Sequence, residues 1–216
     1  MAPPNNVSIR NLGGTWVMDK ARSTNLDAVF KLQGVGWITR KAIAAGTPSL
    51  KITQGSDANR DPGNSSSSTT PSEWMLLEPA LAGVLKAAPD KRPMMWTESE
   101  YSDNLFGPVI IRSQYISGEA MADGRVRPLV EIQTRDLGPD AERMLTEAIV
   151  ITKDNAEEGI IGKAFIHDFA RSVDSGWTAE QIWAVEIIGE ATLLTRRIVV
   201  KKGSFIELAL VFYTHQ

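Results

Sequence analysis

The sequence contains no cysteine and only two histidines, His167 and His215, among its 216 residues. The lack of cysteine excludes a disulfide framework, thiolate catalysis and a cysteine-liganded metal site. Two histidines do not make a histidine-rich metal site, and we expect neither a metal nor a cofactor. No apolar run approaches the roughly 20 residues of a membrane span. The first residues, MAPPNNVSIRNLGG, lack the apolar core of a secretory signal. We therefore expect a soluble, cytoplasmic protein without membrane contact.

Charge of neither sign dominates the sequence. The formal net charge is −3 and no cluster of lysine and arginine stands out, so we expect no binding to nucleic acid. Hydrophobic residues make up 43% and charged residues 23%, as in an ordinary globular protein. A chain of this length is large enough to bury a core without disulfides, and we expect one domain over residues 1–216.

The familiar catalytic motifs are also missing. The sequence has no nucleophile elbow, no glycine-rich phosphate loop, no zinc-binding HExxH motif and no dinucleotide fingerprint. Gly34 and Gly36 lie between two predicted helices and follow no strand, so they predict no dinucleotide site. These absences fit an enzyme that needs no nucleophile, and they fit a binding protein equally well.

What the chain does contain is a series of β-rich runs at its C-terminal end. Short breaks, each with a glycine, separate four runs, at residues 163–172, 178–188, 191–202 and 204–213. Such breaks are hairpin signals, because glycine adopts the positive φ of tight turns. Consecutive hairpins form an antiparallel meander, and closure into a barrel is the arrangement that removes its open edges.

The upstream segments supply the rest of this barrel. Short β-rich segments occur at residues 11–18, 49–53, 73–78, 92–101, 109–117 and 127–135. Between the first two, residues 23–32 and 36–45 have helical spacing, and helices there would cover one opening of the barrel. The segment at 79–90 fits either a helical turn or a broken strand. The prediction is an all-β, mainly antiparallel closed barrel of about 8–10 strands, with two short helices between strands one and two.

Three regions fall outside the predicted wall. Residues 1–10 are a polar leader that we expect to be flexible. Residues 54–72 are rich in Ser, Asp, Asn and Gly, with four consecutive serines, and predict a disordered loop. Residues 118–162 form an insertion, with a turn-rich link and a short helix at 141–148 that Pro139 would begin.

Two adjacent arginines in the run at 191–202 decide what the interior offers a ligand. Side chains alternate along a strand, so one of Arg196 and Arg197 faces the barrel interior, and the sequence does not say which. A buried arginine needs a carboxylate or an anionic ligand. The alternatives are therefore a ligand-orienting arginine, an exposed pair, or an internal ion pair with Glu98, Glu131 or Glu186.

Other candidate site residues are aromatic or titratable. His167 lies between two phenylalanines on one strand face, where it is either a wall residue or a group that polarises a ligand oxygen. Trp16 is either a core plug or a ligand contact. The candidate catalytic hydrogen-bonding residues are Arg196, Arg197, His167 and Tyr115. The candidate substrate-binding residues are Trp16, Trp37, Met94, Trp96, Glu98, Phe165, Phe169, Trp183 and Tyr213.

Four segments, NLGGTWVMDK, LQGVGWITRKAI, DNLFG and GWTAEQIW, resemble motifs of a group of small fungal proteins with lipocalin-like, calycin-type barrels. The match departs from this pattern in the loop at 54–72 and in the insertion at 118–162. The resemblance implies a helical lid between the first two strands, as in fatty-acid-binding proteins. Some proteins of this group are cofactor-free pericyclases, including hetero-Diels–Alderases that join a tropolone-derived quinone methide to a sesquiterpene such as humulene.

Three functions of different classes follow. The first is a cofactor-independent pericyclase, which holds two apolar substrates in a reactive pose and polarises a carbonyl oxygen. The second is a non-catalytic carrier of a fatty acid or another hydrophobic metabolite, whose carboxylate an arginine would bind. The third is a structural protein whose own side chains fill the barrel. The sequence is also compatible with a homodimer.

Overall fold

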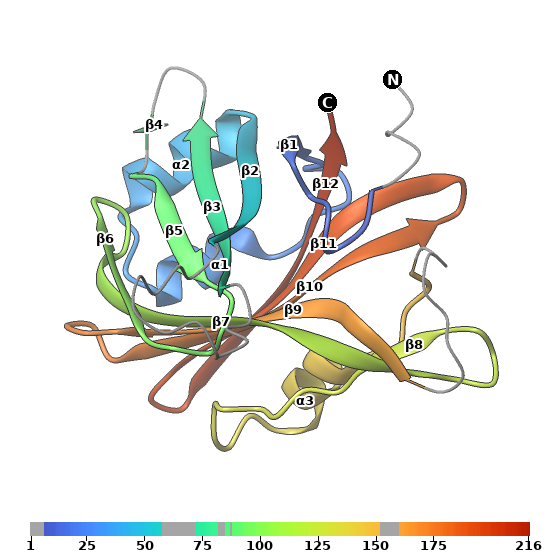
Figure 1. Ribbon diagram of the computed structural model, residues 1–216. Coiled ribbons are helices and arrows are strands. Elements are labelled where there is room, and N and C mark those ends of the chain that lie inside the picture. Colours follow the sequence, from blue (N-terminus) through green and yellow to red (C-terminus); the bar gives the residue numbers. More distant parts are fainter. Residues whose placement is uncertain (1–6, 58–71, 82–84, 87, 152–159) are drawn as a thin grey trace, which may run out of the picture.

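The computed structural model describes residues 7–57, 72–81, 85–86, 88–151 and 160–216. Over these residues the chain forms one sheet of 12 antiparallel strands, together with the helices α1–α3 (Figure 1). The strands are β1 (Gly14–Met18), β2 (Pro48–Asp57), β3 (Ser72–Leu81), β4 (Leu85–Lys86), β5 (Asp90–Pro93), β6 (Ser99–Asp103), β7 (Gly107–Ala120), β8 (Val126–Pro128), β9 (Ile160–Ser172), β10 (Trp177–Ile188), β11 (Ala191–Lys202) and β12 (Phe205–His215).

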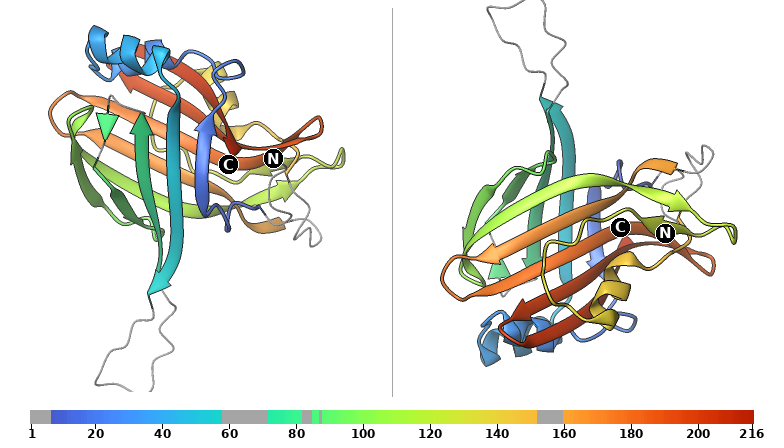
Figure 2. Two further views of the ribbon diagram at one scale, coloured as in Figure 1. Left: turned by 90° about the horizontal axis from the view of Figure 1, so that it is seen from above. Right: turned by 90° about the horizontal axis from the view of Figure 1, so that it is seen from below.

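The sheet curls until its two sides meet, so the predicted lipocalin-like, fatty-acid-binding-protein-like barrel is confirmed (Figure 2). The strand order is β4-β3-β2-β1-β12-β11-β10-β9-β7-β6, and β5 pairs with β3. The segment after β5 connects the two sides. Met95 forms an antiparallel bridge with Gln114 of β7, and the backbone N–H of Trp96 donates to Ser113 O at 3.0 Å.

The four C-terminal strands form the predicted meander, and each is at least 11 residues long. Gly189 and Gly203 lie in its turns with φ of 62° and 59°, the left-handed region that glycine adopts without strain. The upstream strands differ in extent from the prediction. The segment at 92–101 is divided between β5 and β6, because Trp96 has φ of 58° and interrupts the extended backbone.

The helices α1 (Leu26–Leu32) and α2 (Trp37–Ala45) lie between β1 and β2, as predicted, and cover one opening of the barrel. Backbone and side-chain hydrogen bonds attach the start of α1 to β12. Thr24 N–H donates to Leu210 O at 2.9 Å, and the Asn25 side chain donates to Leu208 O at 2.8 Å. The lid is therefore joined to β12, the strand that carries Tyr213.

The opposite end of the barrel is filled by the segment before β1. Val7 and Ile9 of the predicted leader are buried in the inner core, as is Leu12 after it, so the described part of that leader is packed. Residues 1–6 lie outside the described residues. The Gln54 side chain accepts from Leu12 N–H at 2.6 Å and donates to Ile9 O at 3.0 Å. Trp16 has no exposed surface, and its Nε1 donates to Leu12 O at 2.8 Å, so Trp16 is a core plug.

The predicted loop at 54–72 is shorter than expected at both ends. Residues from Gln54 to Asp57 belong to β2, and Ser72 begins β3, with Asp57 and Ser72 as register partners. This polar run is a strand because it has a pairing partner, whatever its composition. Residues 58–71, which contain the serine run, lie outside the described residues.

The predicted insertion packs on the outside of the barrel. Residues 126–151, with β8 and the helix α3 (Pro139–Thr146), cover the outer face of β9, β10 and β11 (Figure 2). Leu145 and Phe165 are fully buried between the two layers and form a second core. Residues 127–135 were predicted to be one strand, but only Val126–Pro128 pair as β8. Residues 152–159 lie outside the described residues.

Candidate ligand-binding site

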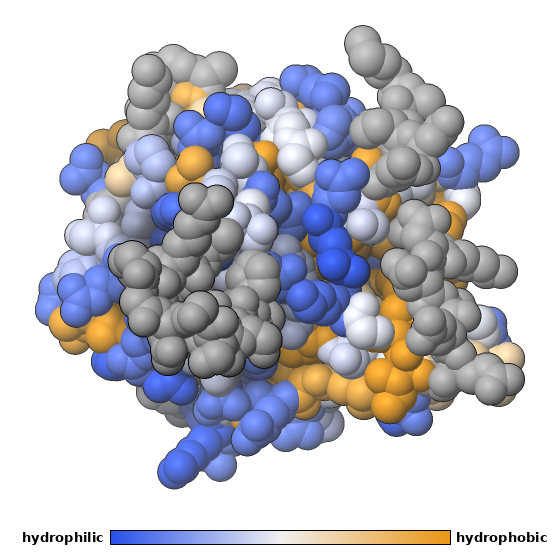
Figure 3. All heavy atoms as spheres, in the orientation of Figure 1, coloured by the Kyte–Doolittle hydropathy of each residue, from blue (hydrophilic) through white to orange (hydrophobic). Residues whose placement is uncertain are grey.

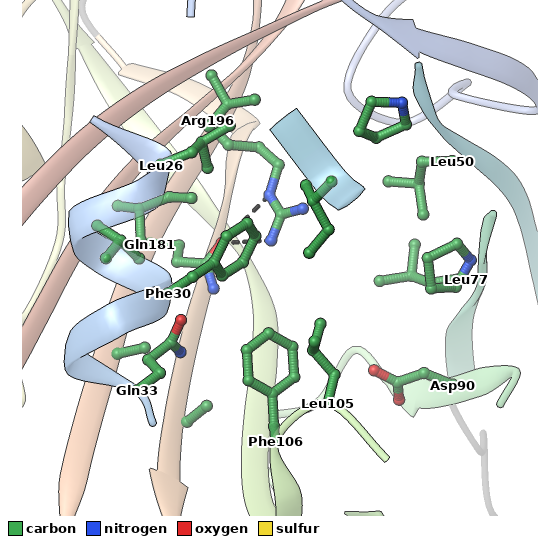
Figure 4. Close-up of a pocket in the computed structure, with 18 of the residues that line it drawn as sticks. Leu26, Phe30, Gln33, Leu50, Leu77, Asp90, Leu105, Phe106, Gln181 and Arg196 are labelled. Atoms are coloured by element: carbon green, nitrogen blue, oxygen red, sulfur yellow. Dashed lines mark hydrogen bonds between the residues drawn. The ribbon is translucent and has the colours of Figure 1, made fainter. Parts of the chain in front are cut away.

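A cavity of about 250 Å³ lies inside the barrel beneath the helical lid (Figure 4). Its walls are mostly apolar. Val29 and Phe30 of α1 face Leu50 of β2 and Leu77 of β3, and Phe106 lies beside Phe30 with a ring-centroid distance of 6.2 Å. A largely apolar cavity of this size accommodates one small molecule.

Arg196 is the basic group that β11 contributes to this cavity. Its side chain lies against the fully buried ring of Trp183, with the guanidinium carbon 4.1 Å from the ring centre. Gln181 Oε1 accepts from Arg196 Nη2 at 2.5 Å and from Nε at 3.2 Å. Arg196 Nη1 lies 3.5 Å from the hydroxyl of Tyr213. Three strands, β10, β11 and β12, therefore fix one guanidinium inside the barrel.

No carboxylate lies within 4.0 Å of the Arg196 side-chain nitrogens among the described residues. Figure 4 shows the guanidinium directed into the cavity, with its bonds to Gln181 behind it. An amide and a hydroxyl orient a cation but do not neutralise it. Because an unpaired charge in an apolar setting is costly, this arrangement favours an anion or a strong hydrogen-bond acceptor in the cavity.

A second inward arginine, Arg92 of β5, has the opposite character. Its Nη1 lies 2.7 Å from Asp168 Oδ2, and its Nη2 lies 2.6 Å from Asp90 Oδ2. Burial by itself lowers the pKa of Arg92, but the charges of Asp168 and Asp90 outweigh it and raise the pKa above its ordinary value. Arg92 is therefore fully paired, whereas Arg196 is not.

Arg197 was a candidate catalytic residue, and its side chain lies on the outer face of β11, away from the cavity. Its guanidinium is hydrogen-bonded to Glu186 beneath the 126–151 layer, and its Nε lies 3.5 Å from a Glu147 oxygen. Glu186, one of the three candidate partners, is therefore the partner of Arg197, but the pair lies between the two layers and not inside the barrel. A side chain on this face cannot contact a ligand inside the barrel.

His167 also faces outward, because it alternates with the inward Asp168 along β9. Its Nε2 lies 2.8 Å from Glu180 Oε1, and its ring stacks on Trp96 at 4.6 Å. Burial by itself raises the pKa of Glu180, but hydrogen bonds from His167 and from the backbone of residues 133 and 134 outweigh it and lower the pKa. This buried pair therefore attaches the outer layer and does not reach the cavity.

The remaining candidates separate into cavity, core and surface. Tyr213 lines the cavity, and the ring of Trp183 packs against the guanidinium of Arg196. Tyr115 lies inside the barrel at the plugged end, where it accepts from Gln54 Nε2 at 2.8 Å and where burial raises its pKa. The others do not line the cavity: Trp16 and Met94 are inner core, Phe165, Phe169 and Trp96 lie on the outer side, and Trp37 and Glu98 are exposed.

Several residues that line the cavity were not among the candidates predicted from the sequence. Gln181 stands two residues before Trp183 on the same strand face, and this spacing was the available signal for its role beside Arg196. Asp90 and Arg92 gave no such signal, because the run DKRP has three charged residues followed by proline and shows no alternation of apolar and polar residues. Phe30 and Phe106 meet only because the lid folds over the turn between β6 and β7.

Comparison with known proteins gave no family-model match and no curated protein that matches by sequence. Among solved structures, a REP1-NXSQ fatty acid transporter aligns over 95% of this chain and 96% of its own, with 11% identity and a TM-score of 0.48. A Schistosoma mansoni fatty acid binding protein in complex with arachidonic acid aligns over 97% and 99%, with 18% identity and a TM-score of 0.45. These likenesses are weak, and the ligands of those proteins do not identify a ligand for this chain.

Two further properties concern only the residues that the structure describes. None of their helices has both the length and the apolar character that crossing a bilayer requires. No three of their metal-ligating side chains come together in a way that could hold an ion.

Proposed function

We propose that this chain binds one small apolar molecule inside the barrel and holds an oxygen acceptor of that molecule, best matched by a carboxylate, at Arg196. The supporting observation is the Arg196 guanidinium, which faces an apolar cavity without a carboxylate partner among the described residues. Nη1 of Arg196 and the hydroxyl of Tyr213 form the donor pair that meets the ligand. The protein then acts as a carrier of a fatty acid or a related hydrophobic metabolite.

The physical basis is a division of roles within the cavity. Apolar walls remove the hydrocarbon part of the ligand from water, which supplies most of the binding free energy. A charge-assisted hydrogen bond to a fixed guanidinium orients the polar end. Because Gln181 and Trp183 already hold the Arg196 side chain, little side-chain entropy remains to be lost when the ligand binds.

Calorimetric titration with lauric acid tests this proposal. Wild type should bind lauric acid, and Arg196→Met should lose about tenfold or more in affinity, which corresponds to about 1.4 kcal/mol. Arg143→Met is the matched control, because Arg143 is an exposed arginine of α3 that contacts no part of the cavity. Equal affinity for lauric acid in wild type and Arg196→Met, with both proteins folded, would sink the proposal.

A pericyclase is the second candidate, and one observation favours it. Arg196 and Tyr213 place two donors side by side in an apolar cavity. Such donors would polarise the carbonyl of a quinone methide, while the walls hold it against a terpene such as humulene, and the reaction needs no nucleophile. This activity rests on Arg196 and Tyr213 alone, since Arg197, His167 and Tyr115 do not line the cavity.

Product analysis separates the two candidates. The protein is incubated with a tropolone-derived quinone methide precursor and humulene, beside a protein-free sample. Faster formation of a single stereoisomer, lost in Tyr213→Phe and Arg196→Met, would establish the cyclase. Retention of a ligand without new product would leave the carrier. The cytoplasmic location and the homodimer are not tested by this product analysis, and both stay predictions.

A further inference from the structure

We infer that the ligand carries a second polar group, a hydrogen-bond donor that Asp90 accepts on the side of the cavity away from Arg196. This inference rests on the proposed function and narrows it. The ligand class is an apolar molecule with an oxygen acceptor at one end and a hydroxyl or ammonium group at the other.

The first step is the charge of the cluster that contains Asp90. Arg92 brings one positive charge, whereas Asp90 and Asp168 bring two negative charges. All three side chains are nearly buried, with exposed fractions of 12%, 6% and 1%. The cluster therefore holds one more negative charge than positive charge in a setting where uncompensated charge is costly.

The second step is the spare hydrogen-bonding capacity of the two carboxylates. The bonds from Arg92 use Oδ2 of Asp90 and Oδ2 of Asp168. Oδ1 of Asp168 is buried and has no hydrogen-bond partner, and Oδ1 of Asp90 accepts no bond from any described residue. An ionised carboxylate can accept several hydrogen bonds, so the cluster lacks donors.

The third step is access. Asp90 lines the cavity, whereas Asp168 does not. Figure 4 shows the carboxylate of Asp90 and the guanidinium of Arg196 on different sides of the cavity, with the apolar side chains of Leu77 and Leu105 nearer to Asp90. A ligand that fills the cavity between them therefore meets a donor surface at one end and an acceptor surface at the other.

This arrangement also predicts which ligands are rejected. The charges of Arg196, Arg92, Asp90 and Asp168 sum to zero, but the positive excess lies at Arg196 and the negative excess at Asp90. A dicarboxylate would satisfy Arg196 and place its second anion against Asp90, where like charges repel. Specificity then comes from an attractive end and a repulsive end together.

A ligand series on wild-type protein tests the inference without any substitution. Calorimetry compares lauric acid with its ω-hydroxy, ω-amino and dicarboxylic counterparts, and then with the same sets of shorter and longer chains. At the chain length that reaches Asp90, the ω-hydroxy or ω-amino acid should bind about tenfold more tightly than the plain acid. The dicarboxylic acid should bind more weakly than the plain acid at the same length.

Two aspartate variants then locate the effect. Asp90→Asn should bring the affinity ratio of the ω-hydroxy acid to the plain acid close to one. Asp168→Asn is the matched control. It also removes one carboxylate charge that is paired with Arg92, but at a position that does not line the cavity. It should keep the ratio well above one.

The outcomes separate the inference from the proposed function. If no plain acid of any length binds, the proposed function fails and the inference fails with it. If plain acids bind at Arg196 but neither ω-substituent improves affinity at any length, the carrier stands and the role of Asp90 is overturned. A gain with the ω-amino acid alone identifies the donor as a cation, and a gain with the ω-hydroxy acid identifies a hydroxyl.

Discussion

At the scale of single residues, Arg196 and Arg197 show how one strand gives two neighbouring side chains opposite tasks. Arg196 faces the cavity and is held by an amide, a hydroxyl and an indole ring. Arg197 faces the outer layer and is paired with Glu186. The same chemical group is therefore available to a ligand in one case and committed to the fold in the other.

Substitution of each arginine by methionine should separate these tasks. Arg197→Met leaves the nearly buried Glu186 without its cation, and we expect it to lower the free energy of unfolding by about 3–5 kcal/mol. Arg196→Met removes an inward charge that lacks a carboxylate partner, and we expect little or no loss of stability. Urea unfolding of both variants measures the difference. Equal destabilisation would contradict the separate roles.

Glu180 gives the fold a dependence on pH. Its pKa in the folded protein lies below the ordinary value of 4.5, because His167 and two backbone N–H groups stabilise the carboxylate. A lowered pKa contributes stability above pH 4.5, and this contribution is lost as the pH falls through the folded-state pKa. Wild type should therefore lose stability faster than Glu180→Gln as the pH falls below 4.5. Parallel unfolding curves against pH would contradict this expectation.

At the scale of elements, the strand meander could be predicted because glycine breaks and β-rich runs are local signals. Which of the two faces of each strand points into the barrel could not be predicted. A strand of an isolated barrel has an apolar face and a polar face, whereas β9, β10 and β11 are buried on both. Phe165 and Val199 pack against the outer layer, just as Ile166 and Val200 pack inside, so hydrophobicity does not mark the interior.

The outer layer should contribute to stability without contributing to binding. Leu145 of α3 is fully buried among the side chains between the layers. Leu145→Ala should therefore lower the free energy of unfolding by about 2–5 kcal/mol, and it should leave the affinity for lauric acid unchanged. Arg143→Ala, at an exposed position on the same helix, is the control for a change in helix propensity. A matching loss of ligand affinity would show that the two layers are coupled.

At the scale of the whole molecule, two cores share one set of strands. The inner core runs from the plugged end to the cavity, and the outer core lies between the sheet and residues 126–151. Apolar residues also reach the surface near β7, β8 and β9, as the space-filling view shows (Figure 3). The cavity is thus the part of the inner core that the chain does not fill. This explains why its existence could not be predicted from composition, which describes both cores together.

The two cores predict an additive response to ligand and mutation. A ligand that binds only the folded state stabilises it by about 2.7 kcal/mol at a free concentration one hundred times its Kd. Because Leu145 lies in the outer core and the ligand in the inner cavity, lauric acid should stabilise wild type and Leu145→Ala by the same increment. Arg196→Met, with weaker binding, should show a smaller increment at the same concentration. Urea unfolding with and without lauric acid measures all three, and an unequal increment for Leu145→Ala would mean that the outer layer shapes the cavity.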